Sequence, residues 1–84
     1  MLTSLALMSL HKSPMIPLAE ICDRYFALSY EEAAKKAARN ELPVPAFRLT
    51  SSRKAPLMVS AETLGAWIDK TELQAKELWE RSQV

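Results

Sequence analysis

The chain has 84 residues, and its 11 Lys and Arg nearly balance 10 Asp and Glu, so the formal net charge is +1. This length allows one domain with a modest core. Below about 70–80 residues a lone core is barely sufficient, so a dimer interface would add stability. A single cysteine excludes an internal disulfide, and with one histidine the chain offers neither a metal-ligand cluster nor a Cys/His dyad. We therefore expect a non-enzymatic protein without metal or cofactor.

The first predicted element is the apolar stretch 2–10. It has no basic region before it, is too short to span a bilayer and lacks a clear small-residue cleavage site, so it is neither a signal peptide nor an anchor. We expect a short helix or strand that packs onto the domain, followed by a connector at 11–14. Elsewhere there is no transmembrane segment, internal repeat or low-complexity tract, which predicts a soluble intracellular protein without membrane contact.

Residues 17–26 predict an amphipathic helix. Its apolar residues recur at i, i+3, i+4, i+7 and i+8, and they are Leu18, Ile21, Cys22, Tyr25 and Phe26. Pro17 is well placed as the first helical residue, and Cys22 is best explained as a small buried residue in a reducing compartment. The connection at 27–29 is short enough to make the following helix cross this one steeply, as a helix-turn-helix requires.

Residues 30–39 predict a second, basic helix. Ser29 is a good N-cap and Glu32 completes a capping box, while Leu28 and Ala33 are placed for a hydrophobic staple. Helical spacing places Glu32, Lys35, Lys36 and Arg39 on one face, with Ala34, Ala37 and Ala38 as a small apolar face behind them. A basic face of this kind serves DNA binding in some helices, although in most it is simply solvated.

The second helix should end near Asn40, because Asn tolerates the left-handed cap conformation and the Leu-Pro-Val-Pro run at 42–45 forces an extended path. A hairpin signal follows. Phe47 and Leu49 alternate with polar residues, the tip at 51–56 is polar and basic, and 57–59 is a second apolar run. A loop here is either an ordinary surface turn or a wing that contacts phosphates or a minor groove.

Ser60 predicts the N-cap of a long helix that continues to about Arg81. Its apolar stripe consists of Leu64, Trp67, Ile68, Thr71, Ala75 and Leu78. The first half closes the core, whereas the part beyond residue 70 still carries Leu73, Leu78 and Trp79, more apolar surface than one small core can use. These three residues either pack on the N-terminal segment or contact a second copy or another protein.

The small net charge conceals an asymmetry along the chain. Residues 30–54 hold six Lys or Arg against three acids, giving +3, whereas 60–84 hold three against five, giving −2. Positive charge thus coincides with the basic helix and the hairpin. The candidate DNA-contacting residues are Tyr30, Lys35, Lys36, Arg39, Arg48, Ser52, Arg53 and Lys54, and the candidate oligomerisation residues are Leu73, Leu78 and Trp79.

Three stretches carry a family resemblance. They are Met-Ile-Pro-Leu-Ala-Glu-Ile-Cys at 15–22 with Tyr25-Phe26 behind it, the 42–45 break with Phe47-Arg48, and Val-Ser-Ala-Glu-Thr-Leu-Gly-Ala-Trp-Ile-Asp at 59–69. Together with the apolar residues 5–8, they resemble the pyocin activator protein family, PrtN, nearly from end to end. The middle also resembles the wider AlpA and excisionase group, in which a serine-capped second helix precedes a Leu/Phe-Pro-x-Pro break and a basic wing.

The resemblance implies a bacterial, cytoplasmic, prophage-linked activator of bacteriocin or phage-tail-like genes, whereas the wider group implies an excisionase that directs recombination. One departure from the AlpA-type pattern is the acidic first turn of the second helix. Glu31 and Glu32 either face away from DNA or accept hydrogen bonds from cytosine amino groups.

The residue pattern and the resemblance together predict a mainly α protein with a small β-hairpin, a winged helix-turn-helix of the MerR or excisionase kind with a long C-terminal helix. We expect one DNA-binding domain over 1–84, divided into 1–14, the helix-turn-helix and wing at 15–59, and the helix 60–82. Its expected partners are double-stranded DNA, RNA polymerase or a recombinase, and a second copy, with half-sites one helical turn or a multiple apart. The alternative is a protein-interaction module that acts through its C-terminal helix without DNA contact.

Overall fold

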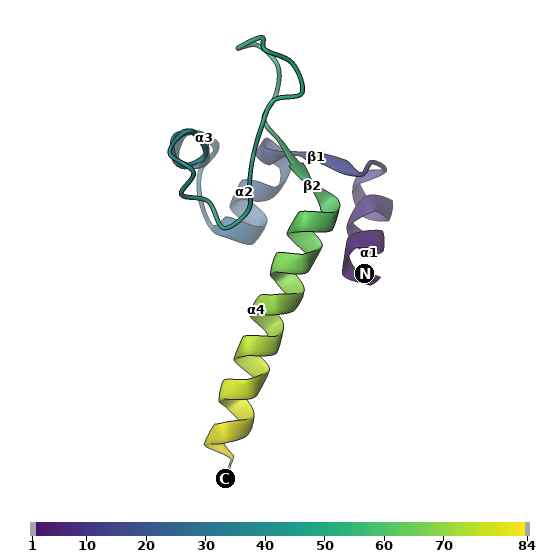
Figure 1. The fold of residues 1–84 in the computed structure, drawn as a ribbon, viewed down its shortest axis with the longest axis vertical. Helices are drawn as coiled ribbons and strands as arrows, with labels where there is room; N and C mark the ends of the chain where they lie inside the picture. The colour runs from purple at the N-terminus through teal and green to yellow at the C-terminus, as the bar shows by residue number, and fades with distance from the viewer. Residues whose placement is uncertain (1, 84) are drawn as a thin grey trace.

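The computed structural model describes residues 2–83, which form four helices and two short strands (Figure 1). In chain order these are α1 (Leu2–His11), β1 (Met15–Pro17), α2 (Leu18–Phe26), α3 (Tyr30–Ala38), β2 (Met58–Ser60) and α4 (Ala61–Ser82). The molecule measures 53 × 26 × 17 Å because α4 extends far beyond the other elements. None of these helices is both long and apolar enough to cross a bilayer. The mainly helical fold and the long C-terminal helix confirm what was predicted from the sequence.

The two strands differ from the predicted hairpin. β2 pairs antiparallel with β1, which the sequence analysis did not predict, and Ile16 lies opposite Val59 with both side chains fully buried. The expected pairing of 47–50 with 57–59 is reduced to a single bridge between Phe47 and Met58. Two buried β-branched side chains make the first pairing the more favourable one, whereas residues 48–54 are all exposed and, apart from Leu49, polar.

Helix α2 presents its predicted apolar stripe to the core, with Leu18, Ile21 and Cys22 buried. Pro17 is its N-cap and not its first helical residue, because ψ is 133° and the residue still belongs to β1. The helix ends at Ala27, which adopts the left-handed conformation with φ 55° and ψ 38°. The Leu28 amide donates to the Cys22 carbonyl at 3.1 Å, which fixes the turn into the next helix.

Helix α3 begins and ends where its local signals predict. The Glu32 amide donates to the Ser29 hydroxyl at 3.2 Å, as expected for an N-cap. The second bond of a capping box takes another form, because the Glu32 carboxylate accepts from the Ser29 hydroxyl at 3.3 Å. At the other end Asn40 has φ 56°, and the Glu41 amide donates to the Lys36 carbonyl at 2.8 Å, which closes the helix.

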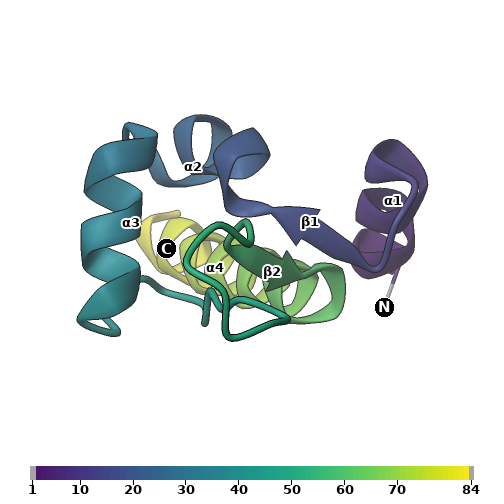
Figure 2. The same ribbon diagram turned by 90° about the horizontal axis from the view of Figure 1, so that it is seen from above.

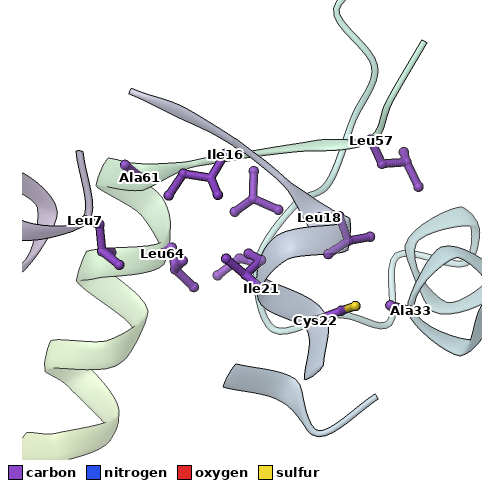
Figure 3. Close-up of a cluster of buried hydrophobic side chains, with 11 residues drawn as sticks. Leu7, Ile16, Leu18, Ile21, Cys22, Ala33, Leu57, Ala61 and Leu64 are labelled. Carbon is purple, nitrogen blue, oxygen red and sulfur yellow. The ribbon is translucent and has the colours of Figure 1, made fainter. Parts of the chain in front are cut away.

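The core lies between α2, α4 and the two strands, and Figure 3 shows its side chains pointing toward one another. Its fully buried large residues are Ile16, Leu18, Ile21, Val59 and Leu64. Helix α3 contributes Ala33, and α1 contributes Leu7 from the far side of α4. At the lower edge of the core, the rings of Phe26 and Trp67 meet edge to face at 5.3 Å.

The N-terminal segment forms a helix, α1, which packs along the first half of α4. Gly65 lies directly beneath Ser4, so the two helix backbones approach closely. The Thr3 hydroxyl donates to the Asp69 carboxylate at 2.5 Å and extends this contact by a turn. Helix α4 begins at the predicted cap, with the Thr63 amide donating to the Ser60 hydroxyl at 3.3 Å.

Candidate nucleic-acid interface

The basic side chains of α3 project away from the body. Ala33 is fully buried against the core, while Lys35 and Arg39 lie on the opposite side of the helix and are exposed. Lys36 is exposed on the flank of the helix. Arg39 lies 3.7 Å from the Glu41 carboxylate, and both side chains remain largely exposed, so this pair is weak and leaves the guanidinium accessible.

Of the residues in the first turn of α3, Tyr30 lies apart from this basic face, whereas Glu32 shares its side, about 20° of helix rotation from Arg39. Tyr30 is 42 % exposed, but it precedes Arg39 by about 180° of helix rotation and so shares the side of Ala33. The Glu32 carboxylate is held at the N-cap by its bond to Ser29. This bond turns one of the two acids of the first turn toward the cap. Glu31 is exposed.

The second basic element is the loop between Phe47 and Met58, residues 48–57, which we call the basic loop. Its base is fixed by two backbone bonds between Phe47 and Met58, 3.0 and 2.7 Å long. Within it, the Arg48 Nε donates to the Ala55 carbonyl at 3.0 Å, so this arginine ties one side of the loop to the other. Its role in the structure is to hold the loop closed.

The tip of the basic loop is a turn organised by hydroxyl groups. The Lys54 amide donates to the Ser52 hydroxyl at 3.2 Å, and the Ser52 amide donates to the Thr50 hydroxyl at 3.4 Å. Ser52 thus shapes the turn, and Arg53 and Lys54 project from it with exposed side chains. Thr50 is a contributor that the sequence analysis missed, although a hydroxyl two residues before a turn is a recognisable signal.

The two basic elements lie at the same end of the molecule. Figure 1 shows the basic loop rising above the body and α3 beside it, both remote from the C-terminus. A shallow groove separates them, lined by Ala34, Ala37, Ala38, Ala46, Phe47, Arg48 and Leu57. The small side chains on α3 let the base of the loop approach the helix. The structure therefore gathers the predicted basic residues at one end, while Tyr30 lies on another face of α3.

The distal half of α4 carries the other predicted site. Every residue from 70 to 83 is exposed, and Leu73, Leu78 and Trp79 are 56 %, 65 % and 62 % exposed. More than half of each side chain is accessible, so α1 does not bury them, and of the alternatives given above burial against the N-terminal segment is excluded. Among the described residues no group of His, Cys, Asp or Glu has an arrangement suited to a metal ion.

The fold and these surfaces define a small, mainly helical protein whose basic helix and basic loop share one end, with a projecting helix at the other. The family model of pyocin activator protein PrtN matches residues 3–75, and the chain belongs to this family. Membership implies the activation of pyocin genes, which is a regulatory role and not an enzymatic one. No curated protein and no solved structure matches the chain.

Proposed function

We propose that this protein is a DNA-binding transcriptional activator of prophage or bacteriocin-type genes in the bacterial cytoplasm. One observation carries the proposal: α3 and the basic loop, which both carry exposed cations, lie at a single end of the molecule. Phosphate oxygens are the natural partners of such a surface, and a capped helix beside a loop is a common arrangement for a helix in a major groove. The family assignment supports the same role.

The proposed contacts divide into two kinds. Lys35 and Arg39 on α3 face the major groove together with Lys36, while Arg53 and Lys54 contact the backbone or a minor groove. Arg48 and Ser52 belong to the proposed set because they hold the loop in shape. Tyr30 remains a predicted contact, but from another face of α3 than Lys35 and Arg39.

The salt dependence of binding to double-stranded DNA tests this proposal. If five basic residues each neutralise one phosphate, the slope of log K against log salt should be about −4 to −5, since each contributes about −0.9. Replacing Arg53 and Lys54 together by Ala should weaken binding to all sequences alike and reduce the slope by up to about two units.

A matched control is available on α4. Replacing Lys70 and Lys76 by Ala also removes two exposed cations, but from the projecting helix, and it should leave affinity and slope unchanged. A slope near zero for the native protein, or equal losses in the loop variant and the α4 variant, would refute the proposed surface. Loss of site preference with retained affinity for random DNA would instead make Arg53 or Lys54 a base reader.

The excisionase alternative uses the same surface differently, because it needs several copies side by side on bent DNA, whereas an activator needs a defined promoter site. A reporter gene behind the selected DNA site distinguishes them. Activation that is lost with Arg39→Glu and Arg53→Glu supports our proposal. Binding without activation, together with an adjacent integrase gene, supports excision, whereas activation that ignores both reversals supports a protein-interaction module.

A further inference from the structure

The projecting half of α4 has a regular pattern that DNA binding does not use. From Leu64 onward, residues on one side of the helix recur at alternating intervals of four and three, and they are Leu64, Ile68, Thr71, Ala75, Leu78 and Ser82. This spacing averages 3.5 residues, the repeat with which two helices wind around each other. The first two residues of the stripe pack on the core, but the last four are exposed.

We propose that this exposed stripe, which we call the α4 seam (Thr71, Ala75, Leu78 and Ser82), pairs antiparallel with the same stripe of a second copy. Trp79 lies at its edge, about 100° from Leu78, and covers the contact. Leu73 does not belong to it, because it lies about 140° from Leu78 around the helix. Of the exposed large apolar residues in the distal half of α4, Leu78 and Trp79 therefore belong to the proposed contact and Leu73 does not. The proposed pairing does not depend on DNA binding.

The body of the protein dictates the antiparallel direction. Helix α2 lies on the seam side of α4 at its upper end, where Phe26 touches Trp67. Paired helices lie about 8–10 Å apart, so in a parallel pair both α2 helices would need the space that the partner helix occupies. In an antiparallel pair the two bodies lie at opposite ends, and only the exposed halves overlap.

Sterics and charge then select the same register. If Ile68 met Leu78 of the partner subunit, the partner's helix end would run into α2, and Glu72 would face Glu72 of the partner subunit. A shift of one heptad places Ala75 against Leu78 of the partner subunit and avoids both problems. In this register Gln74 lies beside Arg81 of the partner subunit, and no like charges meet along the seam.

The seam is short and rich in small side chains, so the pairing is weak on its own. Thr71, Ala75 and Ser82 allow the backbones to approach, but only Leu78 and the flanking Trp79 bury much apolar area. Less than two heptads are unpartnered, which is fewer than a stable coiled coil needs. We therefore expect a concentration-dependent dimer in the micromolar range or weaker.

Thiol crosslinking without DNA tests direction, face and register together. Two differently tagged variants, Thr71→Cys and Ser82→Cys, are mixed at high micromolar concentration with a short bismaleimide, while the native Cys22 stays buried. The antiparallel register predicts heterotypic products between the two tags in excess of homotypic ones. Leu73→Cys mixed with Ser82→Cys is the control for the opposite face and should give only background crosslinking.

A second measurement, by analytical ultracentrifugation, uses a matched pair of variants. Leu78→Ser combined with Trp79→Ser should raise the dimer dissociation constant at least about tenfold. Leu73→Ser, which is almost as exposed, should leave it unchanged. Homotypic Thr71→Cys products, or a native protein that stays monomeric throughout, overturn the proposal. A monomer whose reporter activity still requires Leu78 and Trp79 would assign the seam to another protein.

Discussion

The close approach of α1 to α4 at Gly65 gives the sharpest stability prediction. A Cβ added at Gly65 would lie 2.9 Å from the Ser4 backbone nitrogen and 3.0 Å from its Cα. Backbone atoms cannot rotate away, so α1 must shift off α4. Such overpacking costs about 1–3 kcal/mol, whereas alanine in a helix interior gains about 1 kcal/mol over glycine. We expect Gly65→Ala to lower the free energy of unfolding by about 1 kcal/mol, against the helix propensity.

Urea denaturation followed by circular dichroism measures this change. Ala66→Gly is the control, because Ala66 neighbours Gly65 on the same helix but is exposed, and it should cost about 1 kcal/mol from propensity alone. Combining Gly65→Ala with Ser4→Gly should restore only part of the loss, since the two backbone distances remain. Amide exchange in α1 should also become faster in Gly65→Ala. A Gly65→Ala protein that is more stable than the native one would refute the reasoning.

Two further predictions concern the turn between α2 and α3. Ala27→Gly should raise the free energy of unfolding by up to about 1 kcal/mol in urea denaturation, because glycine adopts the positive φ of this position without a Cβ clash. Ala38→Gly, at a right-handed helical position, should lower it by about as much, and a stabilised Ala38→Gly would contradict this account. Ser29→Ala should cost about 1 kcal/mol through the lost cap of α3, and an unchanged melting temperature would show that the cap contributes nothing.

The helices followed from the sequence because their signals are local. Ser29 and Ser60 cap the helices that they were expected to cap, and Asn40 takes the left-handed conformation after α3. The apolar stripe of α2 identified its buried face. Each of these features depends on residues within one or two turns, so a single sequence suffices to find it.

The strand pairing did not follow, because it is non-local. Met15–Pro17 is too short for periodicity to reveal, and its partner lies far along the chain. The sequence predicted which basic residues the candidate site contains, but it did not predict the conformation of the basic loop. Nothing in the sequence pattern indicates that Arg48 ties the basic loop to Ala55, because this bond depends on the path of the loop. The placement of Tyr30 and Arg39 on opposite sides of α3, by contrast, follows from helical spacing alone.

The pairing of β1 with β2 has a consequence for how this protein can change over evolutionary time. Strand β1 follows α1 and strand β2 precedes α4, so their pairing closes the base of the intervening segment, residues 18–57. Lengthening a loop within such a segment costs little free energy, since a doubling of loop length adds only about 0.6 kcal/mol of closure entropy. Insertions and substitutions in the basic loop can therefore accumulate while the strand pair, and the helices it joins, remain as they are.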